Sequence, residues 1–134
     1  MNSMTRRATA VAGQFYPSSP EKLAGAVRAF MDDSEVQPAP DAVRALIVPH
    51  AGYMYSGPTA GFAYQRIKGK QPKRVVLLGC SHRYAISRAS VFVDGVFETP
   101  LGEFPIDSAT ARTLAQRTDS QSAEPHLLEH ALGV

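Results

Sequence analysis

The chain has one cysteine, little net charge and no long apolar run, and each of these absences excludes a class of protein. Cys80 is the only cysteine among 134 residues, so an internal disulfide framework is impossible. The formal net charge is +2 without a basic block, which gives no electrostatic reason to expect nucleic acid or an anionic membrane as partner. No segment approaches the ~20 apolar residues of a membrane span. Because the start of the chain also lacks a secretion signal, we expect a cytoplasmic protein.

What is present is the composition of an ordinary globular domain. Hydrophobic residues make up 44% of the sequence and charged residues 19%, as in folded proteins rather than disordered ones. A chain of this length fits one domain and buries roughly two-thirds of the surface that it exposes when unfolded. We therefore expect a single domain over residues 1–134, in which Pro38 and Pro40 belong to an internal linker.

Apolar periodicity and turn residues predict alternating helices and strands. The clearest helix covers residues 18–33, with Ser19 as N-cap, Pro20 at the first helical position and one apolar stripe. The other predicted helices are residues 58–68, the segment from the N-cap Asp107 to about residue 117, and residues 124–132. The predicted strands are the continuous apolar runs 43–48 and 74–79 and the short run 90–93.

The remaining segments give weaker signals. Residues 1–9 are expected to form a loose arm, residues 10–17 an edge strand or an extended segment, and residues 95–105 a turn-rich excursion. The order strand, helix, strand over residues 43–79 is a βαβ unit. The expected fold class is therefore α/β, with an open, mostly parallel sheet and flanking helices.

Two histidines follow the two strongest predicted strands. His50 lies in Pro49-His50-Ala51-Gly52-Tyr53, just after the run 43–48, and His82 closes Gly79-Cys80-Ser81-His82 after the run 74–79. Ligands bind at the carboxyl ends of strands in open α/β sheets, and neighbouring strands lie ~4.8 Å apart. Imidazole is the commonest metal ligand and suits zinc, iron and copper. The pattern predicts a shared metal site; the alternative is two separate histidines that are satisfied in turns.

The third ligand of such a site stays open. A catalytic metal usually has three protein ligands and an open position, and a carboxylate completes the facial triad of non-haem iron. Glu98, Glu103 and Asp107 are candidates, but their spacing selects none of them. Cys80 is a candidate for a soft ligand or a reactive thiol, while a lone cysteine at a strand end is also typical of a small buried hydrophobe.

A further cluster lies near the end of the sequence. The segment from His126 to His130 reads H-x-x-E-H, which on a helix is the inverzincin pattern, with two zinc-binding histidines and Glu129 as base. A second interpretation is that Glu129 or His130 joins the site of His50 and His82. A third is an ordinary surface helix.

Five motifs in order resemble the Memo family, whose prokaryotic members are called AmmeMemoRadiSam system protein B. The motifs cover nearly the whole chain: AVAGQFYP at 10–17, PHAGY with YSG at 49–57, LGCSH at 78–82, TPLG at 99–102, and His126 with the pair Glu129-His130. The resemblance implies a fold similar to the class III extradiol dioxygenases (LigB-like), with a metal pocket at the ends of strands.

The resemblance also implies roles for individual residues. His50 matches the histidine of the family's PHAGY motif and His82 that of its SH motif, so both are implied as ligands of Fe(II) or copper. Glu129 and His130 match the family's EHS motif, although Ala131 replaces the serine. The other residues implied to line the pocket are Tyr53, Tyr55, Cys80 and Ser81. Cys80 lies where the family varies, so it does not match the family's cysteine ligand.

Length is the largest departure from the family, whose members are about twice as long. We therefore expect the N-terminal half of the fold only, with the third ligand in the absent half or on a second chain. A half-sheet would leave an unpaired strand edge that favours association. The family name implies partnership with a radical-SAM protein and an Amme-type protein.

Three functions follow from these expectations. The first is a metal-dependent, dioxygenase-like oxidoreductase that acts on O₂ and a small phenolic or carbonyl substrate. The second is a non-catalytic module for peptide binding or metal handling, since eukaryotic relatives are associated with phosphotyrosine peptides and cell motility; Tyr16, Tyr53 and Tyr55 would line its groove. The third is an inactive half-domain.

Overall fold

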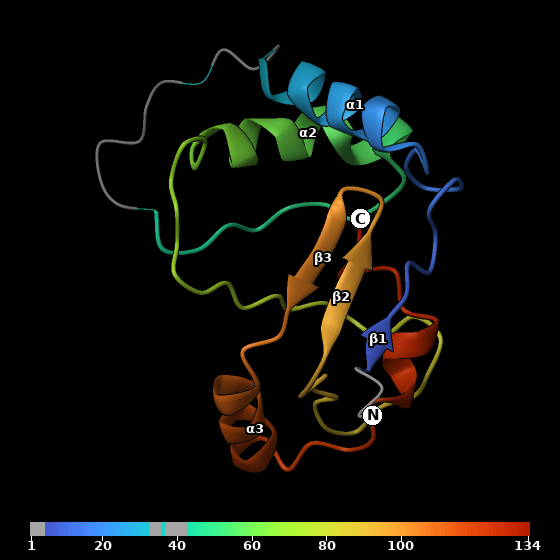
Figure 1. The fold of residues 1–134 in the computed structure, drawn as a ribbon, viewed down its shortest axis with the longest axis vertical. Coiled ribbons are helices and arrows are strands. Elements are labelled where there is room, and N and C mark those ends of the chain that lie inside the picture. Colours follow the sequence, from blue (N-terminus) through green and yellow to red (C-terminus); the bar gives the residue numbers. More distant parts are fainter. Residues whose placement is uncertain (1–4, 33–35, 37–42) are drawn as a thin grey trace. The chain divides into compact units, whose positions relative to one another are not determined.

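The computed structural model describes residues 5–32, 36 and 43–134 (Figure 1). The chain divides into two compact units. Unit 1 comprises residues 1–10 and 76–133, and unit 2 comprises residues 11–75 and residue 134. Among the described residues, no helix combines the length and the apolar character that crossing a membrane requires.

Unit 2 is built on two helices, α1 (Pro20–Asp32) and α2 (Tyr53–Gln65), which pack against each other. The sequence predicts α1 correctly, and Ser19 Oγ accepts a hydrogen bond from the Lys22 amide at 3.3 Å, as expected of an N-cap. The helices approach closely because α2 presents Gly57 and Gly61 to Phe30 of α1. A Cβ atom at Gly57 would overlap the Phe30 ring, and one at Gly61 would overlap the Phe30 carbonyl oxygen.

Helix α2 begins at Tyr53, five residues before the predicted start at Pro58. The first turn forms ahead of the proline because the Tyr55 and Ser56 amides donate to the Gly52 carbonyl, at 2.8 and 3.1 Å. Pro58 then lies inside the helix, where it removes one backbone hydrogen bond. Gly57 and Gly61 lie on either side of this proline and pack closely against α1.

Unit 1 contains a three-stranded open sheet in the order β1-β2-β3 (Figure 1). Strand β1 (Arg6–Arg7) pairs with β2 (Val96–Thr99) in parallel, and β2 pairs with β3 (Gly102–Pro105) antiparallel. The mixed α/β class and the open sheet are confirmed, but the sheet has one parallel and one antiparallel pair. Its resemblance to the extradiol dioxygenase fold stays a prediction.

Two weak predictions in unit 1 are wrong. Residues 1–9 are not a loose arm throughout, since Arg6 and Arg7 form β1. Residues 95–105 are not irregular, since they form the β2–β3 hairpin. The hairpin turn is held by Thr99, whose Oγ1 donates to the Gly102 carbonyl at 3.0 Å and accepts from the Leu101 amide at 3.1 Å. Because a polar side chain makes these contacts, the spacing of apolar residues in the sequence does not predict the turn.

The two strongest strand predictions are also wrong for the described part of the chain. Residues 43–48 and 74–79 belong to no strand there, so the predicted βαβ unit is not formed. Ile47 is 100% exposed and Leu78 92%. A parallel strand needs hydrogen-bonded neighbours, and the described sheet supplies none to these runs. Residues 90–93 make only one bridge, Ser90 with Gln121, and within residues 10–17 Ala12 bridges Tyr16 across a turn.

In the later part of unit 1, local hydrogen bonds decide where one helix begins and where another stops. Helix α3 (Ser108–Arg117) is confirmed with its N-cap, because Asp107 Oδ1 accepts the Thr110 amide at 3.1 Å. The helix predicted over 124–132 is reduced to a 3₁₀ turn, η1 (Glu124–Leu127). It stops there because the Glu129 carboxylate, not a helical carbonyl, accepts the amides of His130 and Ala131.

Candidate functional site

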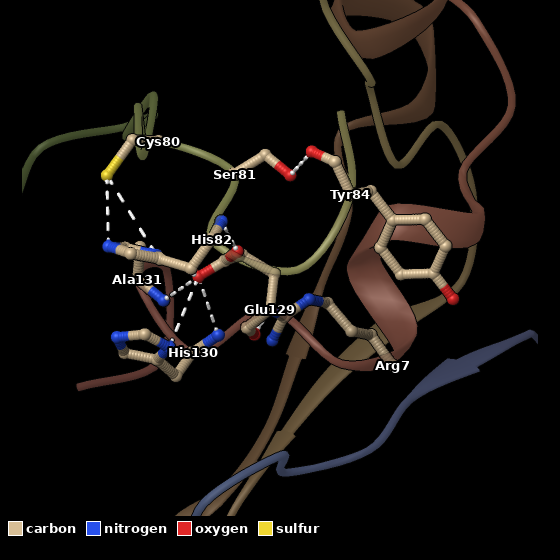
Figure 2. Close-up of polar contacts among 8 residues, drawn as sticks. All are labelled: Arg7, Cys80, Ser81, His82, Tyr84, Glu129, His130 and Ala131. Atoms are coloured by element: carbon tan, nitrogen blue, oxygen red, sulfur yellow. Dashed lines mark hydrogen bonds and ion pairs between the residues drawn. The ribbon is translucent and has the colours of Figure 1, made fainter. Parts of the chain in front are cut away.

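Two histidines of unit 1 lie side by side (Figure 2). The ring centroids of His82 and His130 are 4.4 Å apart with the planes tilted by 32°, and each ring offers a nitrogen within 4.8 Å of the other. The His82 side chain is 36% exposed and that of His130 14%. The pair therefore combines a solvent-accessible imidazole with a sheltered one, and both are metal-binding groups.

Glu129 holds the two histidine segments together (Figure 2). Its buried carboxylate accepts four hydrogen bonds: Oε2 from the His82 amide at 2.6 Å, and Oε1 from His82 Nδ1 and from the His130 and Ala131 amides, each at 2.9 Å. Because an ionised carboxylate only accepts, His82 Nδ1 carries the proton. The lone pair of neutral His82 is then on Nε2, the tautomer that a metal ligand needs when a carboxylate orients its ring.

The environment of Glu129 keeps it ionised. Burial alone raises the pKa of this carboxyl group, because desolvation penalises its charge. The amide donors of His82 and Ala131 and the His82 side chain outweigh burial and lower the pKa to about 2. At neutral pH Glu129 is therefore an anion in contact with both histidine segments.

Arg7 supports the same segment from the sheet. The residue is buried, and its Nη2 donates to the Glu129 carbonyl at 2.7 Å, while its guanidinium lies 4.8 Å from the centre of the Phe97 ring. Strands β1 and β2 supply these two side chains. Arg7 could not be predicted as a residue of the site, because a basic residue near the start of the sequence carries no sign of burial.

His126 lies apart from this pair in unit 1. Its Nε2 donates to the Ser90 carbonyl at 3.0 Å, and its ring packs against Phe92 at 5.6 Å between centroids. Burial lowers its pKa below 6.5, although the Ser90 bond opposes that shift. Since η1 ends at Leu127, the helix that the inverzincin pattern requires is absent from this described segment, and that interpretation is wrong.

The other candidates of unit 1 have separate roles. The exposed Cys80 places its Sγ 3.4 Å from His82 Nε2, while Ser81 donates to the Tyr84 carbonyl at 2.7 Å and shapes the loop. Glu98 and Glu103 both pair with Arg6 on the sheet, and Asp107 caps α3. Among the described residues, none of these three carboxylates lies with His82 and His130 in a group that could hold a metal ion, so none is supported as the predicted carboxylate ligand.

His50 belongs to unit 2. It is half-buried, in a turn that is held to α2 by the hydrogen bond from Ser56 Oγ to the Ala51 carbonyl at 2.7 Å. The start of α2 is in turn fixed to an earlier segment, because the Tyr53 amide donates to the Phe15 carbonyl at 2.8 Å. Because His50 and His82 lie in different units, their pairing stays a prediction.

The predicted pocket tyrosines of unit 2 differ from each other. Tyr53 packs against Tyr16 and Phe30, with ring centroids 5.7 and 5.8 Å away, and burial raises its pKa. It lines an apolar cavity of about 370 Å³ beside α1 and α2. Tyr55 is 80% exposed and does not line that cavity. A shared groove of these tyrosines therefore stays a prediction.

Comparison with known proteins covers both units. Residues 7–134 match the family described as Memo-like protein. The MEMO1 family protein of Thermoplasma volcanium is 36% identical in an alignment that covers 96% of this chain and 48% of that relative. A MEMO1 family protein of Desulfurococcus amylolyticus is 33% identical in an alignment that covers 98% of this chain and 50% of that relative. The chain thus spans about half the length of the curated relatives that it matches.

The family match begins at the buried Arg7 and runs through His82, Glu129 and His130, the residues that build the histidine pair. It covers nearly all of the sequence and agrees with the five motifs. By this match, the chain belongs to the Memo-like protein family.

Proposed function

We propose that this chain binds a transition-metal ion through His82 and His130, with His50 as a third ligand. The contact between Glu129 and His82 Nδ1 carries the proposal. Metal-binding histidines commonly donate their second ring N–H to a carboxylate, which fixes the tautomer and makes the ligand nitrogen more basic. The two imidazoles fit iron or copper, as they fit zinc. When bound, such an ion supplies Lewis-acid and redox chemistry.

Each protein group has a defined task in this proposal. Glu129 holds the proton on His82 Nδ1 and fixes the backbone that carries His130. Arg7 holds the backbone of Glu129 through a hydrogen bond to its carbonyl. His50 is proposed as the third ligand because it lies in the PHAGY motif. Its turn is held against α2 by a hydrogen bond. The family's partners, a radical-SAM protein and an Amme-type protein, are part of the proposal as well.

Dioxygenase-like oxidation is the activity that we propose for the site. The partial exposure of His82 supports access by O₂ and a small phenolic or carbonyl substrate. Metal handling without turnover is the second candidate. It is favoured by the Cys80 thiol, which lies 3.4 Å from His82 Nε2, because soft sulfur ligands select Cu(I).

Metal titration tests the proposal. The protein is loaded anaerobically with Fe(II) or copper, and the dissociation constant is measured for the unmodified chain and for His82→Ala, His130→Ala and His50→Ala. We expect each substitution to weaken binding by roughly tenfold or more, and circular dichroism checks that each variant is folded.

The outcomes separate the parts of the proposal. Unchanged metal affinity in His82→Ala would refute the site. Unchanged affinity in His50→Ala alone would remove the third ligand and leave the pair. Oxygen uptake with a catechol-like substrate supports the oxidoreductase, whereas tight binding without uptake supports metal handling. Cys80→Ser should lower Cu(I) affinity only in the second case.

A further inference from the structure

A short apolar segment of unit 1 is exposed although its sequence is typical of a buried strand. Val76, Leu77 and Leu78 are 57%, 49% and 92% exposed, and in the described part of the chain they belong to no strand or bridge. Three consecutive aliphatic side chains suit a strand that is covered on both faces. Exposed apolar groups of this kind mark interaction sites when they are contiguous.

The segment is held in place at one end. A Cβ atom at Gly79 would lie 2.8 Å from Leu132 Cδ2 and 3.0 Å from Ala131 Cβ, so the chain passes directly against residues 131–132. Residues 129–131 are themselves fixed by the Glu129 carboxylate. Because its carboxyl end is anchored, the segment is presented to solvent at a defined place in unit 1.

The lengths of the relatives supply a candidate for the polypeptide that covers residues 76–78. The matches include 96–98% of this chain but only 48–50% of three family members, so about half of each relative lies outside the matched region. We propose that residues 76–78 form a docking edge for a β-strand from that unmatched half of a Memo-family protein. An added strand would pair with the backbone and cover alternate side chains on each face. This inference rests on family membership and is independent of metal binding.

Binding in trans tests the docking edge. The probe is the part of the Thermoplasma volcanium relative that this chain does not match, expressed as a separate polypeptide. We expect a 1:1 complex in which amide hydrogen exchange at residues 76–78 slows by roughly tenfold or more, as for newly paired strands. Leu78→Lys should weaken the complex by roughly tenfold or more. Leu101→Lys is the matched control, because Leu101 is 51% exposed in the hairpin turn of the same unit.

A second arm does not depend on the solubility of the separate probe. Here the two polypeptides are joined by a flexible linker, and residues 76–78 should again be protected from exchange. Protection absent from this fusion overturns the proposal. So does a trans complex that is unaffected by Leu78→Lys, or concentration-dependent protection in the chain alone, which would make a second copy the occupant.

Discussion

The segments that carry His82 and His50 follow similar apolar runs, yet different forces hold them. In unit 1, one buried carboxylate fixes the His82 loop through its amide and its ring. In unit 2, backbone and hydroxyl hydrogen bonds fix the His50 turn to α2, and α2 packs on α1 through glycines. The histidine segment that follows the apolar run is therefore held by a charged group in unit 1 and by close helix packing in unit 2. Substitutions should separate the two.

The largest effect is expected at Glu129. Glu129→Ala removes the acceptor for four donors, so metal affinity should fall by roughly 10–100-fold. In the metal-free protein, ¹⁵N NMR should show His82 losing its Nδ1–H tautomer, while the His50 ring signals stay unchanged. Glu124→Ala, which alters an exposed carboxylate of η1, serves as the control. An unchanged His82 tautomer would contradict the orienting role of Glu129.

Gly61 should have the corresponding effect in unit 2. Gly61→Ala forces a methyl group onto the Phe30 carbonyl, and overpacking of this kind costs about 1–3 kcal/mol of unfolding free energy. Gly25→Ala is the matched control, because a Cβ atom there has open space. It should stabilise α1 by about 0.5–1 kcal/mol. Urea unfolding measures both, and equal effects would mean that the close helix contact is not what holds unit 2.

His126 should give unit 1 a pH dependence. Burial lowers the His126 pKa below its unfolded value of 6.5, and the nearby charge of Arg7 adds to this while Ser90 and Glu129 oppose it. The unfolded chain then binds the proton more readily. Stability is therefore fully present above pH 6.5 and is lost as the pH falls through the lower folded pKa. The midpoint of urea unfolding, measured against pH, should fall less steeply below pH 6.5 in His126→Gln. An unchanged slope would mean that other groups cause the pH dependence.

The smallest effect is expected at an exposed ion pair of unit 2. Lys68 Nζ lies 2.5 Å from Asp32 Oδ1, but both side chains are more than half exposed. Lys68→Ala should therefore cost no more than about 1 kcal/mol, and added salt should abolish the difference. Thermal unfolding at low and high salt measures it. A large, salt-insensitive loss would show that charge holds unit 2 as well.

Local signals in the sequence predict the helices better than the sheet. Ser19 and Asp107 cap their helices through contacts within three residues, so α1 and α3 follow from neighbouring residues alone. Runs 43–48 and 74–79 have strand character, but a strand also needs a partner, and the described sheet provides none. Helix α2 begins early because backbone bonds to Gly52 form before Pro58.

The site was only partly accessible to sequence reasoning. His82, Glu129 and His130 were identified through motifs, but the spacing of the motifs did not show that Glu129 contacts both histidine segments. Arg7 was missed because its burial depends on the Phe97 ring and a carbonyl more than a hundred residues away in sequence. Tertiary contacts of this kind are set by the fold and not by local pattern.

The contact between His82 and Glu129 has a consequence for folding. The two residues are 47 positions apart, and the β2–β3 hairpin and α3 lie between them. Closing so long a loop costs entropy that local contacts must first offset. The histidine pair should therefore assemble late, after the hairpin and α3, and metal capture during refolding would report the last step in the folding of unit 1.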